Sequence, residues 1–137
     1  MPGNSGQTYV RFIILRTHPD SGSREGIFHV AYGLRDAVTT TSYDKDHLSE
    51  LISWFKGNLS IPDRFSRYNP KKDREKPRRG ISWFKDSATE HIAKMRELTA
   101  IIETYGYTSE QTRTNRPGFI VYEDEFQIVA EPFYSKT

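Results

Sequence analysis

The feature that most constrains this 137-residue chain is a polar stretch near its middle, residues 58–80. The stretch contains three prolines and a glycine and has no apolar period, so it predicts neither a helix nor a strand. The regular elements are therefore expected on either side of it. We expect a long connection here, and connections of this length in compact domains usually serve a function or move.

Positive charge is concentrated within this connection, in residues 64–79, called the basic segment below. The basic segment has eight Lys and Arg against two Asp and Glu, a net charge of +6, whereas the remaining chain has twelve against sixteen, a net charge of −4. The formal net charge of +2 hides this polarity. Segregated charge indicates anionic partners and does not indicate a fold.

Length and composition predict one domain, residues 1–137, with a frayed N-terminus at 1–7. Eight Phe, eight Tyr and two Trp supply bulky core residues despite a mean hydropathy of −0.73. The chain has no cysteine, which excludes disulfides, thiolate metal sites and a cysteine nucleophile. The longest apolar run, Phe12 to Leu15, is too short for a membrane span, and residues 1–7 lack the pattern of a signal peptide. We therefore expect a cytoplasmic location and no membrane contact.

The spacing of apolar residues predicts an α+β fold. Residues 9–15 are apolar on both alternating faces, which predicts a central strand. Three helices are expected at 24–38 (capped by Ser21 or Ser23, with Val38 on its apolar stripe), at 42–56 (capped by Ser42 and ended by Gly57), and from Ser82 or Ser87 to Gly106. Further strands are expected at 107–114, at 119–122 and at 126–130, the first of them a polar edge strand. The order β-α-α-α-β-β-β predicts a four-stranded, mainly antiparallel sheet with three helices on one face.

The pentapeptide Ile-Ser-Trp-Phe-Lys occurs twice, at residues 52–56 and 81–85. The residues that flank the two copies do not match, so the repetition does not indicate a repeat architecture. We expect the first copy to end an amphipathic helix and the second to open one. Phe55 and Phe84 fall on the core stripes, while Trp54 and Trp83 are expected to be half exposed and are candidates for the rim of a binding surface.

The basic segment is the candidate site for an anion, above all for nucleic acid. Clustered Lys and Arg neutralise phosphates, and aromatic rings stack on the bases of single strands. No helix-turn-helix, zinc-finger, RNP or KH signature accompanies it, so base-specific reading is not expected. A solvated linker, or one that pairs with the acidic remainder of the chain, is the alternative interpretation. The candidate residues are Arg64, Arg67, Tyr68, Lys71, Lys72, Arg74, Lys76, Arg78, Arg79 and Trp83.

No catalytic residue, metal site or cofactor is predicted. None of the four histidines has metal-ligand spacing with another, and a partly buried, hydrogen-bonded role is favoured for His91. The carboxylates of residues 123–125 predict a hairpin tip rather than a Mg²⁺ site. Motifs for nucleotide binding, zinc proteases and serine hydrolases are lacking. A small enzyme that acts on a phosphorylated substrate, using His91 or His18 with Arg16 or with an Arg of the basic segment, is a third hypothesis for function.

Three stretches, residues 80–86, 90–92 and 116–125, resemble a group of small bacterial hypothetical proteins. The resemblance covers most of residues 9–133. It implies a bacterial, single-domain, cytosolic protein, and it brings no activity and no catalytic residue.

Our leading hypothesis is a non-enzymatic binding module whose basic segment engages a polyanion, most of all nucleic acid. The alternative is a protein-interaction or regulatory component, in which the segment orders on an acidic protein partner and exposed tryptophans act as anchors. A C-terminal hairpin and a polar edge strand leave both a monomer and a sheet-edge dimer open.

Overall fold

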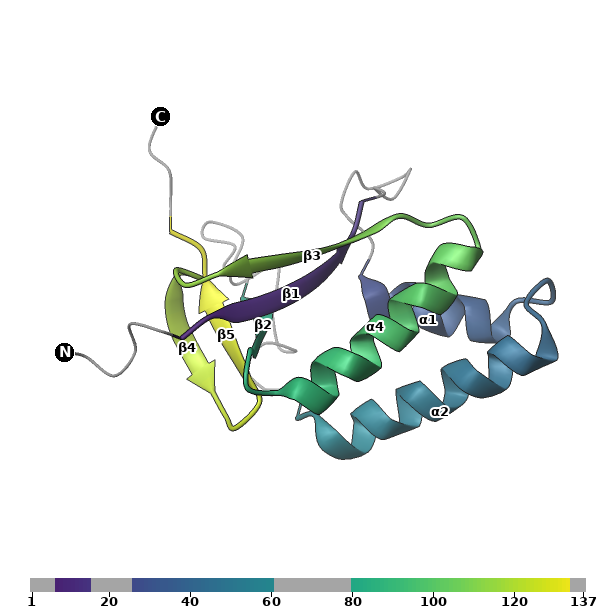
Figure 1. Cartoon of the computed structure of the whole chain (residues 1–137), viewed down its shortest axis with the longest axis horizontal. Coiled ribbons are helices and arrows are strands. Elements are labelled where there is room, and N and C mark those ends of the chain that lie inside the picture. Colours follow the sequence, from purple (N-terminus) through teal and green to yellow (C-terminus); the bar gives the residue numbers. More distant parts are fainter. Residues whose placement is uncertain (1–6, 16–25, 61–79, 134–137) are drawn as a thin grey trace, which may run out of the picture. The chain divides into compact units, whose positions relative to one another are not determined.

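A computed structural model describes residues 7–15, 26–60 and 80–133 (Figure 1). These residues form three helices and a five-stranded antiparallel sheet, which confirms the predicted α+β class. The elements in chain order are β1 (Tyr9–Ile14), α1 (Ile27–Asp36), α2 (Ser42–Asn58), β2 (Ile81–Lys85), α4 (Thr89–Thr104), β3 (Ser109–Thr114), β4 (Phe119–Glu123) and β5 (Gln127–Glu131).

The prediction that the second pentapeptide opens a helix is wrong, because Ile81–Lys85 forms strand β2. Its Ile, Trp and Phe side chains suit a pleated, half-buried surface. Strand partners on both sides satisfy its backbone: Ile81 pairs with Ala130 of β5, and Phe84 pairs with Val10 of β1. The helix that follows begins only at Thr89. The described chain therefore reads β-α-α-β-α-β-β-β, with five strands instead of four.

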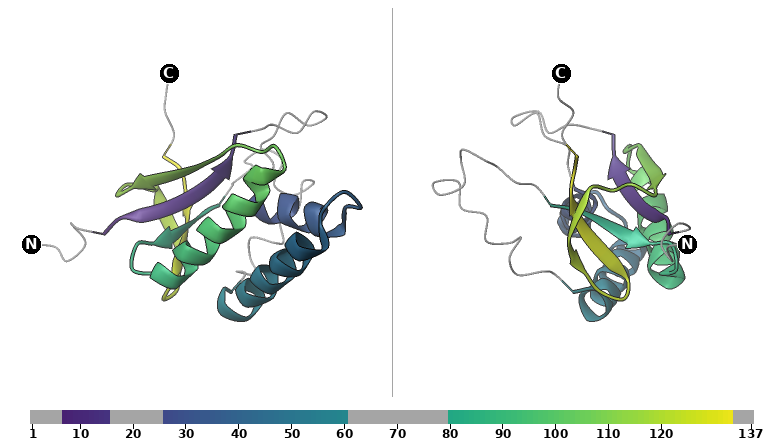
Figure 2. Two further views of the ribbon diagram at one scale, coloured as in Figure 1. Left: turned by 45° about the vertical axis from the view of Figure 1, so that its right-hand side comes forward. Right: turned by 90° about the vertical axis from the view of Figure 1, so that its left-hand side faces the viewer.

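The strand order in the sheet is β3-β1-β2-β5-β4. Strand β1 lies inside the sheet and the polar strand β3 lies at one edge, as predicted; the purple β1 and the green β3 run side by side in both views of Figure 2. Strands β4 and β5 form the predicted hairpin, and β4 is the other edge. That the three helices cover one face of this sheet stays a prediction.

The ends of two helices differ from the sequence-based expectation. Helix α1 stops at Asp36, so Val38 is not on its apolar stripe and is 95% exposed. Its N-cap is Gly26, while the predicted caps, Ser21 and Ser23, lie outside the described residues. Helix α2 is capped by the residue before the predicted cap: the Thr41 hydroxyl accepts a hydrogen bond of 3.1 Å from the Asp44 N–H.

Gly57 also differs from the expectation. It lies inside the last turn of α2 and not after its end. None of the helices in the described ranges is long and apolar enough to cross a membrane.

The chain divides into two compact units, each assembled from stretches that are distant in sequence. Unit 1 comprises Met1–Arg11, Leu59–Ala88 and Arg113–Thr137, and unit 2 comprises Phe12–Asn58 and Thr89–Thr112. In unit 2 the three helices pack on one another around fully buried Leu48, Leu98 and Ile102. The rings of Phe28 and Phe55 meet edge to face there, with centroids 5.2 Å apart.

Unit 1 is built on strands β2, β5 and β4 and has a small core of its own. Tyr9, Ile128 and Ala130 are buried together, and Trp83 packs against them. The turn before β4 requires glycine at Gly118, whose φ is +127°. A side chain there would also clash with the backbone carbonyl of Glu131. Gly118 therefore lets the chain pass close to the end of β5.

Candidate functional site

The structure describes one of the ten candidate site residues, Trp83, which lies in the middle of β2. The other nine fall in residues 61–79 and lie outside the described residues. They are Arg64, Arg67, Tyr68, Lys71, Lys72, Arg74, Lys76, Arg78 and Arg79.

The residues on either side of this stretch are both attached to strand β5. On one side, the backbone carbonyl of Ser60 accepts a hydrogen bond of 2.6 Å from Nε2 of Gln127. On the other side, Ile81 pairs with Ala130. Gln127 and Ala130 are three steps apart along the strand, which corresponds to roughly 10 Å. The chain that carries the basic segment thus leaves from and returns to the same strand.

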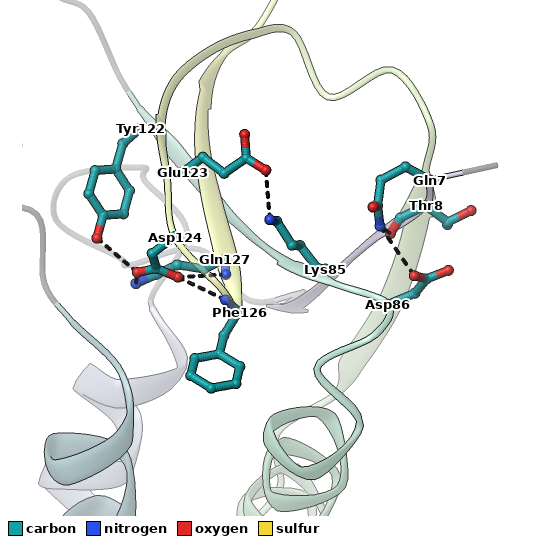
Figure 3. Close-up of polar contacts among 9 residues, drawn as sticks. All are labelled: Gln7, Thr8, Lys85, Asp86, Tyr122, Glu123, Asp124, Phe126 and Gln127. Atoms are coloured by element: carbon teal, nitrogen blue, oxygen red, sulfur yellow. Dashed lines mark hydrogen bonds and ion pairs between the residues drawn. The ribbon is translucent and has the colours of Figure 1, made fainter. Parts of the chain in front are cut away.

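The first attachment depends on the turn between β4 and β5, where Asp124 organises the polar contacts (Figure 3). One carboxylate oxygen, Oδ1, accepts from the N–H groups of Phe126 (2.9 Å) and Gln127 (3.0 Å). The other, Oδ2, accepts from the Tyr122 hydroxyl (2.8 Å) and from Nε2 of Gln127 (3.1 Å). Gln127 is 3% exposed, so its amide is held between Asp124 and Ser60.

These contacts determine the charge state of the turn. Partial burial raises the pKa of Asp124, but the hydrogen bonds from Phe126, Tyr122 and Gln127 outweigh it and leave the pKa below the ordinary value of 3.8. The same carboxylate raises the pKa of Tyr122, because the Tyr122 hydroxyl donates to it. Asp124 is therefore a carboxylate across the neutral range, and the predicted hairpin tip is a hydrogen-bonded turn.

Glu123 also has a partner. Its Oε2 lies 2.6 Å from Nζ of Lys85 in β2, whose side chain is only 17% exposed (Figure 3). Burial first, and then the nearby charge of Glu123, raise the pKa of Tyr9. Within the ranges that the structure describes, no three His, Asp or Glu side chains are grouped to hold a metal ion.

Trp83 is half buried because it lies in strand β2. The sequence pattern predicts half exposure for a different reason, a position beside the apolar stripe of a helix. Its indole packs on the unit 1 core, and the guanidinium carbon of Arg11 lies 5.9 Å from the ring centroid. Among the described residues, none accepts a hydrogen bond from its buried Nε1. The partial exposure that the sequence predicted for Trp83 is thus confirmed, although it lies in a strand and not in a helix.

The histidine named in the enzyme hypothesis is buried in unit 2. His91 is 3% exposed, and its Nε2 lies 2.7 Å from the backbone carbonyl of Asn58. The Trp54 ring packs against it with centroids 4.7 Å apart, and Nζ of Lys94 lies 5.6 Å from the Trp54 ring. This is the hydrogen-bonded histidine that the sequence favoured, with deeper burial than predicted. The other two residues of that hypothesis, His18 and Arg16, lie outside the described residues.

Two exposed aromatic residues were missed by the sequence analysis. Phe119 is 64% exposed and Phe133 is 46% exposed, and their ring centroids are 4.8 Å apart. Sequence alone assigned Phe119 to an apolar strand, which favours a buried ring. Its exposure follows from the position of β4 at the edge of the sheet, for which the sequence carries no local signal.

Comparison with protein-family models, with curated proteins and with solved structures found no match. The resemblance to small bacterial proteins stays a prediction.

Proposed function

We propose that this protein is a non-enzymatic binding module whose basic segment engages a polyanion, nucleic acid above all. The observation that carries the proposal is a net charge of +6 within residues 64–79 of the sequence. Lys and Arg neutralise phosphates and release the counterions that surround them, which gives affinity without base reading. Tyr68 and Trp83 are the aromatic residues proposed to lie against bases.

The attachment of both flanks to β5 supports this function. Because Ser60 and Ile81 are both held on strand β5, the sequence that carries the cationic residues is tied to unit 1 at both of its ends. Positive charge concentrated in one stretch of sequence favours encounter with an anionic partner.

Fluorescence anisotropy with labelled single- and double-stranded oligonucleotides tests the proposal. Affinity should fall steeply when salt is raised from about 50 to 200 mM, because each phosphate contact contributes about 0.9 to the slope of log K against log salt on a duplex. Replacing Arg78 and Arg79 by Ala should lower that slope by about 1.8. Lys45 and Lys56 of helix α2, replaced together by Ala, remove the same charge from unit 2 and should leave the slope nearly unchanged.

The proposal fails if no affinity is measured at low salt, or if the two double variants lose affinity equally. Polyglutamate is the competing probe for the acidic-protein alternative. A preference for polyglutamate over both oligonucleotides would favour a protein partner.

A further inference from the structure

Unit 1 exposes a small aromatic surface at the edge of its sheet. Phe119 is 64% exposed and Phe133 46%. The two phenylalanine rings contact each other edge to face, with an interplanar angle of 77°. Single exposed apolar residues are ordinary, whereas two exposed aromatic rings in contact form a candidate surface for another molecule.

The backbone holds these rings in place. Phe119 pairs with Glu131 across the hairpin, two residues before Phe133. The positive φ of Gly118 allows the close approach to the Glu131 carbonyl, which brings the start of β4 onto the end of β5. Rings fixed in this way lose little conformational entropy when a ligand covers them.

A cation accompanies the aromatic pair. The guanidinium carbon of Arg116 lies 5.5 Å from the centroid of the Phe133 ring, and the Arg116 side chain is in an exposed position. A guanidinium stacks on aromatic planes and also binds phosphate. The surface therefore offers an apolar plane and a phosphate-binding group side by side.

The strand register places this surface near the point where the basic segment rejoins the sheet. Ala130 pairs with Ile81 on one side and with Ile120 on the other. Gly80, which directly follows the basic segment, is thus in line with Glu131 and Phe119. Two strand spacings, roughly 10 Å, separate the start of β2 from the start of β4.

We infer that Phe119 and Phe133, together with Arg116, form a base-stacking platform for single-stranded nucleic acid. The inference rests on the proposed function, which assigns most of the phosphate contacts to the cationic residues of the basic segment. The exposed ring of Phe119 stacks on an unpaired base, and Arg116 contacts the adjoining phosphate. A duplex keeps its bases inside, so it gains nothing from the platform.

Replacement of Phe119 tests the platform. Phe119→Ala should weaken binding of a single-stranded oligonucleotide by about 5- to 100-fold and leave duplex binding unchanged. Phe119→Leu should behave like the Ala variant, because it keeps apolar surface but has no ring, whereas Phe119→Trp should retain affinity. Tyr43→Ala is the matched control, since Tyr43 is an aromatic residue of unit 2 that is 77% exposed.

A direct readout accompanies the affinities. The new indole of Phe119→Trp should add quenching by single-stranded oligonucleotide beyond the change that the unmodified protein, which already contains Trp54 and Trp83, shows in the same titration. This measurement keeps the inference testable even if an Ala variant folds poorly.

The possible failures are distinguishable. If the unmodified protein binds neither single strands nor duplexes, the proposed function itself is wrong. If it binds single strands, but Phe119→Ala and Phe119→Leu bind equally well and Phe119→Trp shows no added quenching, the platform alone is overturned. If Phe119→Ala instead converts a dimer to a monomer in sedimentation, with affinity unchanged, the rings form an interface between copies of this chain, which also overturns the platform.

Discussion

The two copies of Ile-Ser-Trp-Phe-Lys have the same sequence and different structures. Residues 52–56 belong to helix α2, whereas residues 81–85 are strand β2 (Figure 1). Local propensity is identical in the two copies, so it cannot be the cause of the difference. The cause must be what surrounds each copy.

The helical copy continues a stripe that begins before it. Leu48 and Leu51 precede Ile52 and Phe55 at helical spacing, and all four are buried in unit 2. Ser53 and Lys56 then fall on the exposed side. The helix is thus stabilised by burial, which overrides the preference of Ile, Trp and Phe for strands.

The strand copy has no such stripe before it, and Gly80 interrupts any helix from that side. Its burial follows no helical stripe: Phe84 is 9% exposed, whereas Ser82, which lies on the same side of the strand, is in an exposed position. Both of its backbone edges pair, with β1 and with β5. The comparison shows that the conformation of this pentapeptide is determined by its long-range contacts and not by its own five residues.

The largest effect on stability is expected from replacing the phenylalanine that each copy contains. Phe55→Ala and Phe84→Ala should each lower the free energy of unfolding by about 3–5 kcal/mol, because both rings are buried. Urea denaturation monitored by tryptophan fluorescence measures both. A cost below about 1 kcal/mol for Phe84→Ala would mean that the strand copy is not part of the core.

Removing the charge of Asp124 should affect the strand copy more than the helical copy. Asp124→Asn weakens the turn that joins β4 to β5, the strand with which β2 pairs, and should cost about 1–3 kcal/mol at neutral pH. Amide hydrogen exchange should rise in residues 81–85 and change little in residues 52–56. Equal changes in amide exchange in residues 81–85 and 52–56 would contradict the view that the Asp124 turn stabilises strand β2 in particular.

The effect of Asp124→Asn should also depend on pH. The folded-state pKa of Asp124 is lower than its ordinary value of 3.8, so its carboxylate stabilises the fold fully above that value. The stabilisation is lost as the pH falls below 3.8 through the folded-state pKa. The difference between the protein and Asp124→Asn should therefore shrink in acid, and a difference that is constant with pH would exclude an electrostatic role.

The smallest differences in stability are expected from substitutions of the serine in each copy. At Ser53, Ala should give a more stable protein than Thr by about 0.5 kcal/mol, because Ala is the better helix former. At Ser82 the order should reverse, with Thr more stable than Ala by up to about 1 kcal/mol. Both serines are exposed, so packing contributes little. Thermal denaturation of the four variants measures the differences, and the same order at both sites would break the comparison.

The part of the fold that local patterns determine was predictable from the sequence. Helix α2 follows from its apolar stripe, and the β4–β5 hairpin follows from two apolar runs joined by an acidic turn. Strand β2 was not predictable, because its partners are distant in the sequence: Phe84 pairs with Val10, near the start of the described chain.

The candidate site divides in the same way. The charge of residues 64–79 can be read directly from the sequence. The attachment of Ser60 to Gln127 and the exposure of Phe119 could not, since both depend on which strands become neighbours. Contacts between residues so far apart in the sequence leave no local pattern from which they could be predicted.

The order β3-β1-β2-β5-β4 also bears on how the protein is made. On the ribosome, β2 emerges before β5 has been synthesised, and at about 5–20 residues per second the delay amounts to several seconds. During that interval Ile81–Lys85 has β1 as a neighbour and lacks β5, its other partner in the sheet. Each newly translated copy of this chain therefore presents a strand-forming segment to chaperones, or to other nascent chains, before its own sheet can be completed.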